Sequence, residues 1–148
     1  MGTPGGLLVA LFVPVAALAA TPAQEKAFVD AYRTAYEAKD AKTLHSLLYT
    51  KGADPQALEF YRMMTTEGMG GKISSIALEP LTADDKAKAM AAMPGPGGKS
   101  VKLPLAPVKK LVIKRTTKDA SGSSSSTSTV FVAEADGRLV IPVPGPAK

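Results

Sequence analysis

The sequence predicts an α+β domain in which N-terminal helices pack on a curved antiparallel sheet of about four to five strands. Helix-start signals and helical spacing of apolar residues are concentrated in residues 21–71. From residue 72 onward the chain consists mainly of short runs rich in Val, Ile, Leu and Thr, separated by turn residues. Helices followed by an antiparallel meander allow a long helix to lie across the sheet.

The first helix carries the strongest signal. Residues 21–24 read Thr-Pro-Ala-Gln, which supplies an N-cap, a proline at the first helical position and the glutamine of a capping box. We expect this helix to run to about Lys39. Phe28, Tyr32 and Tyr36 recur at helical spacing, so one side of the helix is an aromatic stripe that packs on an apolar surface.

Similar signals predict three shorter helices. Asp40 can cap a second helix, and Asp54 followed by Pro55 can start a third. Residues 82–90 predict a fourth. The glycine-rich residues 68–71 end the first helical part of the chain.

The strands are expected over residues 73–78, 101–105, 108–117, 129–135 and 139–143. Asp136 and Gly137 predict a tight hairpin, because both tolerate positive φ. The serine-rich residues 120–128 are expected to form a flexible hairpin tip, and residues 94–98 a linker. Prolines after the last strand leave residues 145–148 as a short tail.

The N-terminus has the pattern of a cleavable signal peptide. Leu7 to Ala20 form an apolar run that is too short to span a bilayer comfortably, and small residues close it. We expect cleavage after Ala19 or Ala20, although no Lys or Arg precedes the run. The predicted organisation is a signal peptide over residues 1–20, one α+β domain over 21–144 and the tail, exported without a transmembrane anchor.

The absence of cysteine narrows the chemistry. With none in 148 residues, disulfides, thiolate metal sites and cysteine nucleophiles are excluded. A small exported domain of this kind suits a bacterial periplasm or the outside of the cell better than a eukaryotic secretory route.

Positive charge is concentrated in one stretch of a chain whose net charge is +5. The stretch, residues 99–118, contains Lys99, Lys102, Lys109, Lys110, Lys114, Arg115 and Lys118. Basic residues alternating with Leu103, Leu105, Leu111 and Ile113 indicate the solvated face of half-buried strands. A contact with an anionic envelope surface is the alternative. Nucleic acid is not expected, because no aromatic residues are interleaved for base stacking.

Side chains capable of chemistry are few. His45, the only histidine, could act as a general base beside a carboxylate, but a lone histidine has no metal-ligand spacing. No serine lies in a Gly-x-Ser-x-Gly elbow. We therefore predict no catalytic residue, metal or cofactor. Tyr32, Tyr36, His45 and Tyr61 are the candidates for contacting a ligand in a cavity.

Residues 28–44 contain an aromatic-faced helix, then Asp40, then a short leucine-containing helix. This segment resembles the opening of nuclear-transport-factor-two-like domains, the cystatin-like α+β cones that include ketosteroid isomerase and polyketide cyclase relatives. The resemblance implies a conical cavity between the first helix and a concave sheet, used for ligand binding, catalysis or homodimer formation. The carboxylate base and the Tyr-and-Asp pair of the steroid isomerases have no matching motif here.

Three functions follow as hypotheses. The first is a non-enzymatic exported module that binds a small molecule or a protein through the cone or the sheet face. The second is a cone-pocket isomerase, cyclase or hydratase, which requires an acid with a raised pKa inside the cavity. The third is an envelope-associated domain that uses the basic stretch 99–118.

Overall fold

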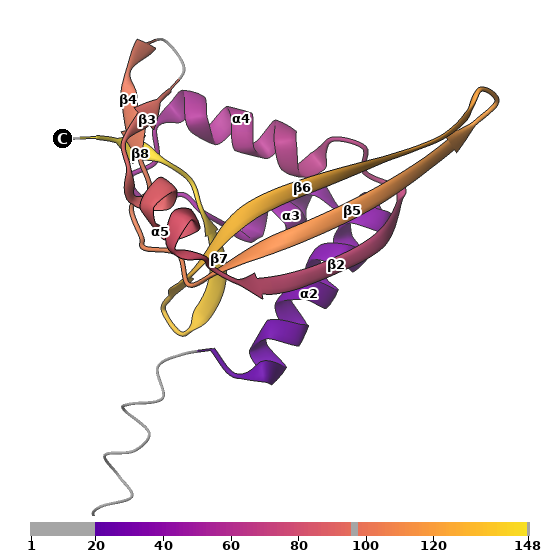
Figure 1. Ribbon diagram of the computed structural model, residues 1–148, viewed down its shortest axis with the longest axis horizontal. Helices are drawn as coiled ribbons and strands as arrows, with labels where there is room; N and C mark the ends of the chain where they lie inside the picture. The colour runs from indigo at the N-terminus through magenta and orange to yellow at the C-terminus, as the bar shows by residue number, and fades with distance from the viewer. Residues whose placement is uncertain (1–19, 96–97, 148) are drawn as a thin grey trace, which may run out of the picture.

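The computed structural model describes residues 20–95 and 98–147 (Figure 1). Helices and two sheets form an α+β domain, which confirms the predicted fold class. The expected signal peptide lies outside the described residues except for Ala20.

The described helices are α2 (Pro22–Glu37), α3 (Ala41–Ser46), α4 (Pro55–Thr66) and α5 (Ala83–Met90). All four predicted starts are confirmed, because Thr21, Asp40, Asp54 and Thr82 are the N-caps. The capping box at Thr21 is complete. Helix α2 ends two residues earlier than expected, since Lys39 adopts a φ of 60°.

The strands are β1 (Leu48–Tyr49), β2 (Lys72–Pro80), β3 (Met93–Pro94), β4 (Ser100–Lys102), β5 (Lys109–Asp119), β6 (Gly122–Ala135), β7 (Arg138–Pro142) and β8 (Gly145–Pro146). The long sheet has the order β1-β7-β6-β5-β2, and the small sheet has the order β3-β4-β8. Strand β1 runs parallel to β7, so the expectation of a wholly antiparallel sheet was wrong at this edge. The reason is that β1 belongs to the helical half and reaches β7 only through a long connection.

The serine-rich segment forms a strand and not the flexible tip that the sequence predicts. Strands β5 and β6 stay in register from Lys109 opposite Val132 to Asp119 opposite Gly122. The tip is therefore reduced to residues 120–121. The prediction failed because ladder hydrogen bonds use the backbone, so a well-paired neighbour can hold a serine run in a strand.

Two further segments are better ordered than predicted. Gly145 and Pro146, expected in a tail, pair with β4, and the amide of Ala147 donates to the carbonyl of Ser100 at 3.0 Å. Gly145 is required there, because a Cβ at this position would collide with the carbonyl oxygen of Gly52. Pro94, expected in a linker, belongs to β3.

The core lies between the aromatic face of α2 and one face of the long sheet. Phe28, Tyr32 and Tyr36 are at most 6% exposed, as the helical spacing predicts. Leu111 and Ile113 are buried against this face from β5. Figure 1 shows α2 crossing behind the sheet, while the β5–β6 hairpin continues beyond the helices to a tip that no other element accompanies.

The fold divides the basic stretch among different environments. Lys109 pairs with Glu25 of α2 at 2.9 Å, and Lys110 pairs with Asp85 of α5 at 2.8 Å. Lys114 is exposed, as the predicted solvated face requires, but Arg115 lies on the helix-covered side together with Leu111 and Ile113. The expectation that all basic residues face solvent was wrong for Arg115.

The ion pair between Asp85 and Lys110 predicts a measurable pH dependence. The hydrogen bond from Lys110, followed by that from the backbone of Thr82, lowers the pKa of Asp85 from 3.8 to about 2. Because this pKa is lower than in the unfolded chain, the carboxylate stabilises the fold above pH 3.8, and the contribution is lost as pH falls towards 2.

In Lys110→Met we expect the Asp85 midpoint, followed by carboxyl-carbon NMR, to rise towards 3.8. Lys88→Met is the matched control, because it breaks only the exposed pair with Asp84 on the same helix. An unchanged Asp85 midpoint in Lys110→Met contradicts the assignment.

Candidate functional site

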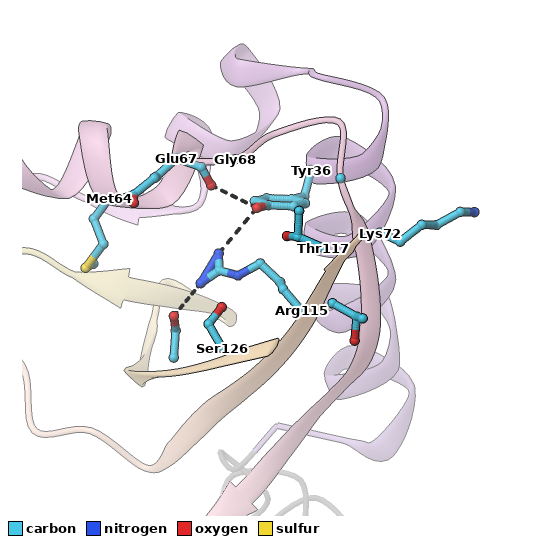
Figure 2. A pocket seen from close by; sticks show the side chains of 11 residues that line it. Tyr36, Met64, Glu67, Gly68, Lys72, Arg115, Thr117 and Ser126 are labelled. Atoms are coloured by element: carbon cyan, nitrogen blue, oxygen red, sulfur yellow. Dashed lines mark hydrogen bonds between the residues drawn. The ribbon is translucent and has the colours of Figure 1, made fainter. Parts of the chain in front are cut away.

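A polar cavity of about 340 Å³ opens where the end of α2 meets the long sheet (Figure 2). Its lining combines hydroxyl groups, glycines, one aromatic ring, one methionine, the acidic residue Glu67 and two cationic residues. The lining residues are Tyr36, Met64, Glu67, Gly68, Gly71, Lys72, Arg115, Thr116, Thr117, Ser126 and Ser128. Small-molecule sites begin at about this volume.

Tyr36 joins α2 to the turn after α4. Its hydroxyl donates to the carbonyl oxygen of Glu67 at 2.8 Å, and its own carbonyl accepts from the amide of Gly70 at 2.7 Å. The turn approaches so closely that a Cβ on Gly68 would lie 2.6 Å from the Tyr36 hydroxyl. A glycine is needed at this position both for this approach and for its φ of +75°.

Arg115 lies across the floor of the cavity. Its Nη1 donates to the Tyr36 hydroxyl at 3.4 Å, and its Nη2 donates to the Ser128 hydroxyl. The guanidinium carbon lies 5.4 Å from the centre of the Tyr36 ring, within the range of a cation–π contact. These contacts from α2 and β6 fix the plane of the guanidinium (Figure 2).

Among the described residues, no carboxylate forms an ion pair with Arg115. The ion pairs found among the described residues involve Lys26, Arg62, Lys88, Lys109 and Lys110, and Arg115 takes part in none of them. Arg115 is nevertheless half-buried. Its fork has five N–H donors, so donors remain for a further acceptor after the two contacts above.

Lys72, the second cationic residue of the lining, points in a different direction from Arg115. Figure 2 shows its amino group pointing away from the guanidinium and out of the cavity. Hydroxyl-bearing residues surround Arg115, because Ser126 is its direct cross-strand partner and Thr117 lies two residues further along the same face. The site therefore presents one oriented cation among hydroxyl groups, an arrangement suited to a small anion.

The four ligand candidates named from the sequence do not surround one cavity. Tyr36 lines the polar cavity, and Tyr61 lines a second cavity. Tyr32 is 2% exposed inside the core, where it stacks on Tyr36 with ring centres 6.4 Å apart. His45 on α3 lines neither cavity, and its Nε2 is buried without a hydrogen-bond partner.

The second cavity, of about 290 Å³, lies between α4 and the small sheet. It is lined by Ala57, Phe60, Tyr61, Met93, Pro94, Gly95, Val101 and Pro144. Phe60 is 51% exposed at its rim. With few polar groups to orient a ligand, this cavity supports a weaker functional argument than the polar one.

Arg115 is the residue that sequence reasoning missed, although a signal was present. Residues at i, i+2 and i+4 of a strand share one face, so Leu111, Ile113 and Arg115 point the same way. An arginine in phase with two buried aliphatic residues indicates an inward-facing cation. Its hydroxyl partners could not be predicted, because Ser128 becomes a partner only once β6 is paired through the serine run.

Comparison with known proteins gives no relative: no family model, no characterised protein and no solved structure matches the chain. The resemblance to nuclear-transport-factor-two-like domains therefore remains a prediction.

Within residues 20–95 and 98–147, no helix is both long and apolar enough to cross a membrane. The same part of the chain holds no group of three or more His, Cys, Asp or Glu side chains that could bind a metal ion.

Gly68→Ala tests the geometry that forms the cavity wall. We expect it to destabilise the fold by about 1 kcal/mol more than Gly52→Ala, because it adds overpacking to the strain of positive φ. Gly52, with a φ of +72° and nothing within 4 Å of an added Cβ, is the matched control. Denaturant unfolding measures this difference in stability. In a Tyr36→Phe background the additional destabilisation by Gly68→Ala should disappear, and its persistence would contradict the contact with the Tyr36 hydroxyl.

Proposed function

We propose that this domain binds a small molecule carrying a carboxylate or phosphate group in the polar cavity, with Arg115 as the anion-binding residue. The half-buried guanidinium without a carboxylate partner carries the proposal. The molecule is bound and not chemically converted.

Partial burial of the Arg115 guanidinium costs solvation free energy. A charged group removed from water loses solvation unless hydrogen bonds and an opposite charge compensate. Tyr36 and Ser128 supply neutral partners, and the Tyr36 ring supplies a cation–π contact. An incoming anion supplies the missing opposite charge, and a planar fork binds carboxylate or phosphate oxygens through paired hydrogen bonds.

The surroundings favour a polar ligand of modest size. A volume of about 340 Å³ accommodates only a small organic anion. Hydroxyls of Thr117, Ser126 and Ser128 can both donate and accept, so they suit hydroxyl or amide groups beside the anionic end.

The enzymatic alternative has less support. Among the described residues, the carboxyl groups with shifted pKa values are Asp40 and Asp85, and both pKa values are lowered, by hydrogen bonds from Thr43 and Lys110 respectively. Neither residue lines the cavity. Burial raises the pKa of Tyr32 to about 12, so its hydroxyl is neutral at ordinary pH.

Calorimetric titration of the full chain with phosphate and with succinate tests the proposal. We expect saturable binding, weakened about tenfold or more in Arg115→Gln, because the charge-assisted hydrogen bonds are lost. Arg115→Lys should restore only part of the affinity, since an ammonium group cannot reproduce the fork.

Arg138→Gln is the control, because it removes the same charge from an exposed position outside the cavity. Equal losses in Arg115→Gln and Arg138→Gln contradict the proposal, as does a chain that binds neither anion at about 10 mM.

A further inference from the structure

The face of the long sheet opposite α2 carries lysines and hydroxyl groups along the part nearest the hairpin tip. We call this surface the lysine face; it consists of Lys72, Ser75, Lys114, Thr116, Lys118, Ser123, Ser125 and Thr127. Directly paired residues point to the same side of a sheet, and so do residues two apart on one strand. Lys114 pairs with Ser75 and Thr127, and Thr116 pairs with Lys72 and Ser125, so these side chains share one side.

The lysine face is exposed and unneutralised. All of its residues are exposed except Thr116, which is half-buried. Among the ion pairs of the described residues, none involves Lys72, Lys114 or Lys118. Two carboxylates lie beside Lys110, towards the other end of β5. Asp85 forms an ion pair with Lys110, and Glu79 is the residue of β2 directly opposite it.

The composition of the lysine face limits its partner. It contains no aromatic or long aliphatic side chain, so it has nothing to insert into the acyl region of a bilayer or to stack on nucleic-acid bases. It also lacks the apolar centre typical of stable protein interfaces. What remains is a charged and hydrogen-bonding surface for a hydrated polyanion.

We propose that the lysine face docks an acidic polysaccharide, a sugar polymer with repeated carboxylate or sulfate groups. Lys114 and Lys118 are four residues apart on one strand, or roughly 13 Å. Hydroxyl-bearing residues occupy the positions between and beside them, in rows about 4.8 Å apart across strands. The lysines pair with the acidic groups, the hydroxyls bind sugar hydroxyls, and many weak contacts along one polymer add up.

The lysine face and the Arg115 cavity meet at Lys72 and Thr116, which also line the cavity, but Lys114 and Arg115 are adjacent in β5 and point to opposite sides of the sheet. The basic stretch 99–118 does not form one docking surface. Lys109 and Lys110 are paired, and Lys102 lies in β4 of the small sheet, away from the hairpin tip (Figure 1). The docking surface instead recruits Lys72 from a different part of the sequence.

The test is binding of the full chain to immobilised alginate, a polyuronate, with uncharged dextran as the polymer control. The combined variant Lys114→Gln and Lys118→Gln should bind alginate at least about tenfold more weakly, with a shallower dependence on salt. Lys72 is left unchanged because it also lines the Arg115 cavity. The matched control, Lys99→Gln and Lys102→Gln, removes the same charge from exposed positions off the face and should stay within about twofold. Thr127→Val keeps every charge and should cost a few-fold.

Two results overturn the proposal. One is equal weakening in the two lysine double variants, which would show a response to net charge alone. The other is tighter binding to vesicles of phosphatidylglycerol and phosphatidylcholine than to alginate, lost in the face variant and unaffected by Thr127→Val, which would make a membrane the partner. Circular dichroism of each variant establishes that the fold is retained.

Discussion

The packing of the aromatic face of α2 against the long sheet is the interaction on which the rest of the structure depends. Phe28, Tyr32 and Tyr36 place three large rings against aliphatic side chains of β5 and neighbouring strands. Aromatic side chains bury large areas and dominate the energetics of protein cores. It also fixes the end of α2, so the Tyr36 hydroxyl is held where the turn after α4 and Arg115 can both reach it.

The cavity follows from a difference in length. Helix α2, with 16 residues, is about 24 Å long, whereas β6, with 14 residues, extends to about 48 Å. The helix cannot cover the whole sheet, so the inner face changes from aliphatic to hydroxyl-bearing side chains where the cover ends. Arg115 lies at this boundary, beyond Ile113 and before Thr117. A cation at that position is shielded enough to be oriented and open enough to meet a ligand.

The two sides of the β5–β6 hairpin thus carry different chemical groups. The inner side ends in a single, oriented guanidinium within a cavity, while the outer side carries Lys114 and Lys118, both exposed. Alternation along β5 separates them, because Lys114 and Arg115 are neighbours in sequence but lie on opposite sides. One run of basic residues therefore supplies two chemically distinct surfaces.

Much of the fold could be predicted because its signals are local. Asp54 followed by Pro55 starts a helix, and the φ values of Asp136 and Gly137, 52° and 78°, are those that the Asp-Gly pair predicts. The parts that could not be predicted depend on partners distant in sequence. The serine run is a strand only because β5 pairs with it, and Gly145 joins a sheet only because β4 lies beside it.

The candidate site was predictable only in part. Helical spacing identified Tyr36, but Tyr32, one turn earlier, is enclosed by the core and cannot meet a ligand in the cavity. His45 was a candidate because its imidazole can act as a general base, but this property does not indicate where the side chain lies in the fold. Arg115 could have been found from its phase with Leu111 and Ile113, whereas Gly68 and Ser128 depend on the tertiary fold.

Binding of an anion from solution by the guanidinium of Arg115 is tested by NMR of the arginine side-chain Nε–H groups during titration of the full chain with phosphate. The chain has four arginines to compare: Arg33, Arg62, Arg115 and Arg138. We expect a saturable shift of the Arg115 resonance that exceeds the shifts of the other three. An Arg115 resonance that stays in place, or four resonances that drift together with ionic strength, would contradict it.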